Sequence, residues 1–271
     1  MTSRTSWRTI VTSGAIARRG ELGTGARMFG YGEQARGRRG GAAPVVAGAL
    51  LLLGAAGCGG GGGDDGKAGP PSASDVTPLA RARLTAASFT HGERIGTYTA
   101  SAYALGVPLG EDYTADPARC QPFVSLTAGA TAFTPAAEVN RRVDADGGTP
   151  GPTVAVQLRS YPGQGAKGVM RALGRAGRDC AGGFTEERAV ARAKYLKAEP
   201  VNAPRLGDES AAYRFTVLDV KEELRLHEYL TVVRSGSATL SFRAETTGTG
   251  DVGGVPEEIV RAQWEKFRPE R

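Results

Sequence analysis

The feature that most limits what this chain can fold into is an apolar stretch at residues 42–56, which separates a leader from everything after it. A cluster of arginines between positions 36 and 39 precedes the stretch, and small residues end it, as in a signal peptide. A bilayer span takes roughly 20 apolar residues, and this stretch is shorter and contains Pro44. We therefore expect residues 1–57 to be a removable export signal.

Cys58 follows this leader directly. The sequence Leu53-Gly54-Ala55-Ala56-Gly57-Cys58 resembles a bacterial lipobox, in which the cysteine is acylated and becomes the new N-terminus. Ala55 stands where a lipobox usually carries leucine, so ordinary cleavage that leaves a free thiol is the alternative. Met28 opens a leader of ordinary length, and we predict that it is the true start. We expect Cys58 to hold the protein at the outer face of the cell membrane through its lipid.

The positive charge of the chain is concentrated in the leader. The whole chain has a net charge of +6, and residues 1–57 contain eight Lys or Arg and two Glu, which accounts for all of it. From Cys58 onward, 26 basic residues balance 26 acidic ones, without a long run of like charge. This balance argues against nucleic acid as a partner.

Cys120 and Cys180 are the two cysteines that remain once Cys58 is assigned to lipid. In an oxidising compartment we expect them to form a disulfide, with two buried free thiols as the alternative. Closing a loop of about 60 residues stabilises a fold by roughly 4 kcal/mol in the chain-entropy model. No Cys-x-x-Cys motif or cluster of histidines accompanies the pair, so we predict no metal site.

Residues 58–78 are rich in glycine, proline and serine, including five consecutive glycines at 59–63. Such a composition predicts a flexible linker. Residues 79–271 are then left to form one extracytoplasmic domain.

Alternation of apolar and polar residues predicts an antiparallel sheet in this domain. Residues 153–160 place Val154, Val156 and Leu158 on one face, and residues 238–244 repeat the pattern. The segment 224–233 and the turn residues 234–237 predict a hairpin with that second strand. Further strands are expected at 95–103, 138–143 and 213–217.

Helical patterns lie between and after these strands. Residues 164–179 carry an apolar stripe that ends at Cys180, and Pro256 with two glutamates opens a helix that buries Ile259, Val260, Trp264 and Phe267. A short helix after Asp116-Pro117 would carry Cys120. The expected fold is α+β, a single domain with an antiparallel sheet, helices packed on one face and one disulfide.

The order of several short segments resembles the extracellular sensor domain of PknH-type serine/threonine kinases and the actinobacterial lipoproteins similar to it. The segments are Cys120-Gln121-Pro122, the strand at Val154, Asp179-Cys180, Leu206-Gly207-Asp208-Glu209-Ser210, Val232-Val233-Arg234-Ser235-Gly236 and Gln263-Trp264-Glu265-Lys266. The resemblance implies an extracytoplasmic module that senses or binds a ligand without catalysis.

Catalytic patterns are weak by comparison. The histidine bases available are His91, in a turn context, and His227, within a strand, and no Gly-x-Ser-x-Gly elbow is present. Asp208 and Glu209 are adjacent, and we interpret them as a turn before a strand rather than as a catalytic pair. We predict no catalytic residues and no cofactor.

Seven of the eight tyrosines follow the linker and fit either sheet packing or recognition, with packing favoured at each; they are at positions 98, 103, 113, 161, 195, 213 and 229. No ligand contact is assigned from the sequence. We expect a binding or interaction module for an unidentified cell-envelope ligand or protein. A secreted hydrolase and a purely structural envelope protein are the alternatives.

Overall fold

The computed structural model describes residues 76–108, 112–126, 132–147, 151–188, 191–219, 221, 223–246 and 248–268. Contacts divide the chain into two units, and every described residue belongs to the second, Asp64–Arg271. The expected leader 1–57, its start at Met28, the lipid site Cys58 and most of the linker 58–78 lie outside the described residues.

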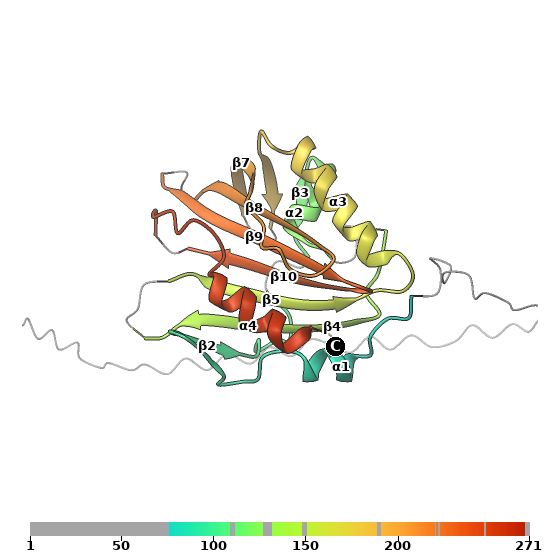
Figure 1. Ribbon diagram of the computed structural model, residues 1–271. Helices are drawn as coiled ribbons and strands as arrows, with labels where there is room; N and C mark the ends of the chain where they lie inside the picture. Colours follow the sequence, from blue (N-terminus) through green and yellow to red (C-terminus); the bar gives the residue numbers. More distant parts are fainter. Residues whose placement is uncertain are drawn as a thin grey trace, which may run out of the picture. The chain divides into compact units, whose positions relative to one another are not determined.

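Ten strands form one antiparallel sheet in the described part of the chain (Figure 1). Their order across the sheet is β1-β2-β4-β5-β10-β9-β8-β7-β6-β3. The strands are β1 (Arg94–Ile95), β2 (Tyr98–Ser101), β3 (Thr114–Asp116), β4 (Ala137–Ala145), β5 (Thr153–Ser160), β6 (Phe184–Glu187), β7 (Arg192–Val201), β8 (Glu209–Leu218), β9 (Arg225–Ser235) and β10 (Ala238–Glu245).

Helices precede, interrupt and follow the strands in sequence. They are α1 (Arg81–Ala86), the 3-10 turn η1 (Ala118–Cys120), α2 (Gln121–Val124), α3 (Gly165–Asp179) and α4 (Glu257–Phe267). The expected α+β class, with one antiparallel sheet and a Cys120–Cys180 disulfide, is confirmed.

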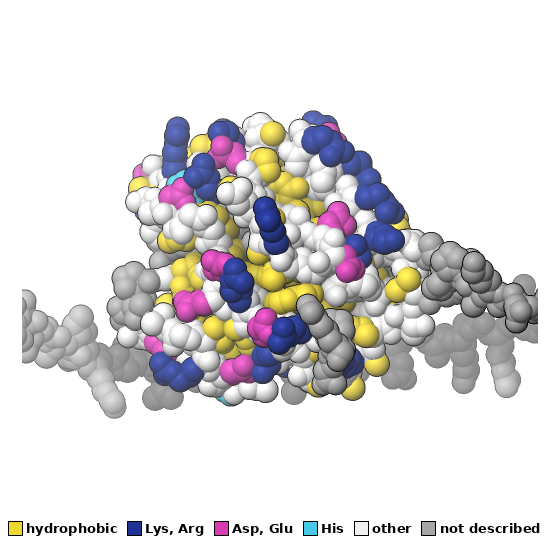
Figure 2. Space-filling view, viewed as in Figure 1, with side chains coloured by type: hydrophobic (Ala, Val, Ile, Leu, Met, Phe, Trp, Pro, Cys, Tyr) yellow, Lys and Arg dark blue, Asp and Glu magenta, His cyan; other side chains and the backbone are white. Residues whose placement is uncertain are grey.

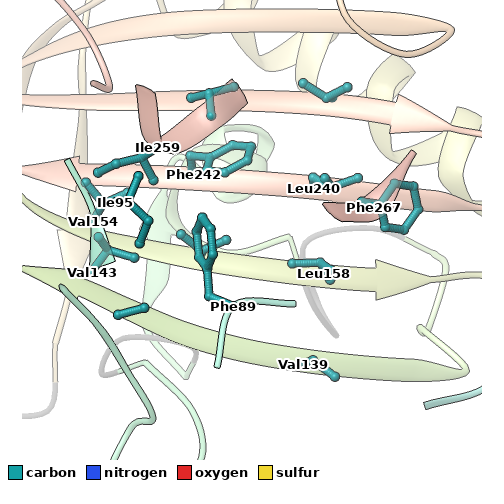
Figure 3. Packing of buried hydrophobic residues seen from close by; sticks show 14 of the residues in the cluster. Phe89, Ile95, Val139, Val143, Val154, Leu158, Leu240, Phe242, Ile259 and Phe267 are labelled. Atoms are coloured by element: carbon teal, nitrogen blue, oxygen red, sulfur yellow. The ribbon is translucent and has the colours of Figure 1, made fainter. Parts of the chain in front are cut away.

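The first core lies between the face of β4, β5 and β10 and the helices α1 and α4 (Figure 3). The alternation predicted from the sequence places Val154, Leu158, Leu240 and Phe242 in this core, all fully buried. Ile259 of α4 packs against them. Fully burying a side chain of this size contributes about 1.5–3 kcal/mol, so this face accounts for a large share of the stability.

The second core lies on the opposite face of the sheet, and β9 shows why. Tyr229 and Val233 join the first core, whereas the alternate residues Leu230 and Val232 join the second. Successive side chains of a strand point to opposite faces, so both faces of β9 are buried.

The expectation that all helices pack on one face is therefore wrong. Helices α2 and α3 contribute to the second core, while α1 and α4 contribute to the first. In Figure 1, α4 crosses the lower strands and α3 lies at the end of the sheet near β7 and β8. The sequence of β9 already indicates burial on both faces, because it contains the nearly continuous apolar run Tyr229-Leu230-Thr231-Val232-Val233. In β5 and β10, by contrast, apolar and polar residues alternate.

The disulfide connects two helical segments, as predicted. Cys120 ends η1 and Cys180 follows α3, with their Cα atoms 5.8 Å apart.

The region expected to form one strand at 95–103 instead contains β1 and β2, which pair with each other across a turn at Gly96, where φ is +57°.

Candidate functional site

A cleft of about 290 Å³ opens on the second face of the sheet, beside the second core. Strands β5, β9 and β10 form its floor, and residues from the end of α2 and from the segments before and after Pro108 surround it. The described residues that line it are Tyr103, Pro108, Tyr113, Val124, Ser125, Leu126, Arg142, Thr153, Ala155, Gln157, Glu186, Arg188, Tyr195, Glu228, Leu230, Ser241, Arg243 and Glu245.

The register of the strands explains why the floor is polar. Glu228 of β9 is opposite Glu245 of β10, and Ala155 of β5 is opposite Arg243 of β10. Residues opposite each other in an antiparallel pair point to the same face. The alternation that buries Phe242 in the first core therefore directs its neighbour Arg243 into the cleft.

Tyr195 connects two carboxylates on this floor. Its hydroxyl lies 2.9 Å from Glu228 Oε2 and 3.1 Å from Glu186 Oε2. A phenol has one hydrogen to donate, so it can donate to only one of the two carboxylates at a time. A proton held on either carboxyl would allow both contacts to be hydrogen bonds.

Arg243 holds the floor against α2. Its Nη1 lies 3.4 Å from Glu228 Oε2, and its Nη2 donates to the carbonyl oxygens of Phe123 and Val124. The guanidinium also lies over the ring of Phe215, 5.9 Å from its centroid. Since the last carbonyls of a helix lack partners within the helix, Arg243 fixes the end of α2 at the edge of the cleft.

A second arginine, Arg188, lies at the side of the cleft. Its Nε donates to Glu186 Oε1 over 2.6 Å, and its guanidinium lies over the ring of Tyr113, 5.5 Å from the centroid. Arg188 is more exposed than Glu186, at 32% against 7% of the side chain. The pair thus extends the charged floor outward to the opening.

Burial changes how these groups hold protons. It raises the pKa of Glu228 from 4.5 to about 7; Arg243 offsets part of this effect, while Glu245 and Glu186 add repulsion. Burial, together with Glu228 and Glu186, raises the pKa of Tyr195 well above its usual value of 10. Tyr195 therefore stays a hydrogen-bond donor, and Glu228 exchanges its proton near neutral pH.

Positive and negative charges are nearly balanced in the cleft at neutral pH, because Glu228 is partly protonated there. Three carboxyl groups, those of Glu186, Glu228 and Glu245, line the cleft against two guanidinium groups that contact them, Arg188 and Arg243. Arg142 also lines the cleft, but it is paired with a carboxylate outside the lining, 2.8 Å away. A ligand that brings a positive charge or hydrogen-bond donors would complete this cluster.

The disulfide predicted from sequence supports the cleft without lining it. Cys120 and Cys180 are buried in the second core, next to Phe123 of α2. Because Cys120 directly precedes α2, the bond fixes the start of the helix whose end borders the cleft. Cys58, the expected lipid site, lies outside the described residues.

The residues weighed for catalysis lie elsewhere. Neither His91 nor His227 is among the described residues that line the cleft. Asp208 Oδ2 accepts hydrogen bonds from Arg234 Nη1 and the Gly236 amide, both over 2.8 Å, and Glu209 is the first residue of β8. In the part of the chain that the structure describes, no group of three His, Cys, Asp or Glu is arranged to hold a metal ion.

Sequence reasoning missed the floor of the cleft. In the sequence, Ser241 and Arg243 alternate with apolar residues as on the outward side of a half-buried strand, and Glu228 lies between Leu226 and Leu230. A glutamate alternating with leucines on the apolar side of a strand is the signal that could have identified it. Packing explains four tyrosines, at 98, 161, 213 and 229, while those at 103, 113 and 195 line the cleft.

Three comparisons with known proteins were informative to different degrees, and matches were found among solved structures. No family model matches the sequence, and no curated protein matches it. Solved structures do. The fold is similar to the extracellular domain of PknH from Mycobacterium tuberculosis. That similarity has 12% identity, covers 71% of this chain and 96% of the other, and has a TM-score of 0.46.

A second solved structure with some similarity is an uncharacterized protein from Mycobacterium smegmatis, an Rv0999 ortholog. The identity is 15%, the TM-score is 0.31, and the match covers 61% of this chain and 80% of the other. At such identities and TM-scores, neither likeness carries an inference about this chain. Among the described residues, no helix has the length and apolar character required to cross a bilayer.

Proposed function

We propose that this protein is an extracytoplasmic lipoprotein, tethered through Cys58, whose domain binds a small ligand in the cleft without transforming it. The observation that carries the proposal is the charged floor of the cleft, where Glu186, Glu228 and Arg243 meet around Tyr195. The rest of the second core beside it is mainly aromatic and aliphatic.

Burying this cluster is costly for the fold. Removing ionised groups from water costs several kcal/mol per ion, and apolar residues of similar volume often stabilise a protein better. The side chains of Glu186, Glu228 and Arg243 are only 7%, 14% and 19% exposed. A costly charged cluster at the base of a cleft is typical of a functional site.

The cleft also indicates the size and chemistry of its ligand. A volume of 290 Å³ suits a small molecule rather than a polymer segment. The carboxyl oxygens on the floor favour a ligand with an amine or several hydroxyl donors, and Tyr103 and Tyr113 offer apolar surface to its carbon skeleton.

The extracytoplasmic location rests on separate support. The sequence of the leader favours export, and the disulfide between Cys120 and Cys180 is of the kind found in oxidising compartments. Intact mass of protein extracted from membranes tests it: we expect a chain that starts at an acylated Cys58. A full-length chain with reduced thiols in the cytosol would refute it.

Ligand-observed NMR with small probes tests the cleft. We expect saturation transfer to ethanolamine or spermidine but not to acetate. Ala155→Phe, which fills the cleft from β5, should abolish the signal, while Ala82→Phe on the exposed side of α1 should leave it unchanged. Binding that survives Ala155→Phe would refute this site. Native mass spectrometry of protein from its host would then reveal any molecule that copurifies.

A hydrolase is the second candidate, favoured by the pKa of about 7 at Glu228, which suits a general acid or base. Turnover of p-nitrophenyl glycosides or esters that disappears in Glu228→Gln would support it. Ligand binding without turnover would support the binding module.

A further inference from the structure

Four basic side chains form a row along the exposed face of α3. Lys167, Arg171, Arg175 and Arg178 follow one another at spacings of three and four, and all are exposed. Figure 2 shows the run of Lys and Arg side chains at the upper right, over the place of α3 in Figure 1. The opposite side of the helix packs into the second core. We call these four residues the basic row.

The basic row is not neutralised within the described chain. None of its members has a carboxylate of a described residue within ion-pair distance. Helix α4 differs, because Arg261 pairs with Glu257 and Arg268 pairs with Glu265 on the same helix surface.

Such a row weakens the helix that carries it. Like charges four residues apart destabilise a helix, and a lysine in the first turn opposes the helix dipole. Lys167, Arg171 and Arg175 are spaced by four, and Lys167 is the third residue of α3. The fold thus carries an unfavourable set of charges that an anionic partner would relieve.

The first described residues of the chain lie close to α3, and their position indicates which anionic partner α3 can reach. The amide of Gly163, two residues before α3, donates to the carbonyl of Val76 over 3.2 Å. The amide of Leu79 donates to Ser160 Oγ over 2.6 Å. The described chain therefore begins beside the start of α3.

Only 17 residues lie between Cys58 and Val76. Even fully extended, the chain between these two residues spans at most about 65 Å. A lipid on Cys58 would therefore keep the start of α3 within about 65 Å of the bilayer surface.

We propose that α3 lies with its basic row against the anionic headgroups of the membrane that holds the lipid. This inference rests on the proposed tether. Basic residues that an anchor holds close to a membrane are attracted to its anionic headgroups, and this attraction adds to that of the lipid. The row also gives the attached domain a fixed orientation.

Arginine labelling on vesicles tests the inference. The acylated protein, extracted from its host membrane, is reconstituted with vesicles of phosphatidylcholine alone or of phosphatidylcholine mixed with phosphatidylglycerol. Floated vesicles are treated with phenylglyoxal and analysed by mass spectrometry. We expect labelling of Arg171, Arg175 and Arg178 to fall several-fold on the anionic vesicles only, and to return at high salt. Arg225, exposed at the start of β9, serves as the internal control.

A variant tests whether the protection depends on the basic row or only on the total charge of the protein. Lys167→Gln with Arg171→Gln and Arg175→Gln should remove the protection of Arg178. The matched control, Lys194→Gln with Lys221→Gln and Arg205→Gln, changes three exposed charges elsewhere, keeps the internal control Arg225 and should preserve the protection.

Each failure has its own meaning. Failure to float with either vesicle would refute the tether and with it the proposed location. Flotation with equal labelling on both vesicles would overturn the contact of α3 while leaving the tether standing. Protection by a soluble poly(glycerol phosphate) but not by vesicles would overturn it as well, because the partner would then be a polymer.

Discussion

Replacing Glu228 by glutamine should change how the stability of the protein depends on pH. Glu228 holds its proton to about pH 7 in the folded cleft, whereas its ordinary pKa is 4.5. Between these values the folded state keeps a proton that the unfolded state releases. Stability from this group is therefore fully present below the ordinary value and is lost as pH rises through the folded one.

The magnitude follows from the size of the shift. One pKa unit corresponds to about 1.4 kcal/mol, so a rise from 4.5 to about 7 corresponds to about 3 kcal/mol across the whole window. Glutamine resembles the protonated carboxyl and cannot ionise. The variant should therefore match the wild type in acid and exceed it by about 3 kcal/mol in mild alkali.

Urea unfolding, followed by circular dichroism at about pH 5 and about pH 8, measures this difference. The control is Glu223→Gln, which changes an exposed glutamate in the turn before β9. Glu228→Gln should flatten the decline of stability with pH, and the control should follow the wild type. Parallel pH profiles for Glu228→Gln and wild type would show that the carboxyl ionises as it does in water, and the account of the buried floor would be wrong.

Three other changes have expected outcomes. Replacing Cys120 and Cys180 by alanine should lower the free energy of unfolding by roughly 4 kcal/mol, as judged by urea titration, because the bond closes a loop of 60 residues. Hydrogen bonds from the Tyr229 hydroxyl, the Gly253 amide and Arg214 lower the pKa of Asp251 to about 2. The ionised carboxylate therefore stabilises the fold above the ordinary pKa of 3.8, and this stability is lost as the pH falls from there through about 2. In Asp251→Asn, the free energy of unfolding should no longer show this decline in acid when it is measured as a function of pH. Tyr195→Phe should cost about 1–3 kcal/mol and raise the pKa of the neighbouring glutamate further, measurable by NMR titration, whereas an unchanged pKa would contradict the shared hydroxyl.

The sequence predicted those elements in which local pattern and burial agree. Strand β5 occupies the predicted residues, β10 extends one residue beyond them, and α3 begins one residue late, because each has one apolar face with an unbroken period. The hairpin of β9 and β10 was also predicted, from its turn residues. In these elements the hydrophobic period alone decides the structure.

Strands β6 and β7 were missed for a physical reason. A register shift between Tyr195 and Lys197 breaks the period of two, so the buried residues of β7 are Ala193, Tyr195 and then Ala198. Exposed charged residues lie between these buried ones, so the sequence of β7 resembles that of a loop. The cleft could not be predicted, because its residues come from strands that are distant in sequence and meet only through the sheet.

Strand β9 contributes to both cores and to the cleft, and this has a consequence for ligand binding. A slip of one residue would exchange Glu228 with Tyr229, putting an aromatic ring among the carboxylates and a charge under α4. Hydrophobic contacts on two faces therefore fix the position of the carboxyl that faces the cleft, so the proposed binding site is already arranged without a ligand. Recognition by such a prearranged site loses little conformational freedom, so a small molecule should associate rapidly, without first waiting for the backbone to rearrange.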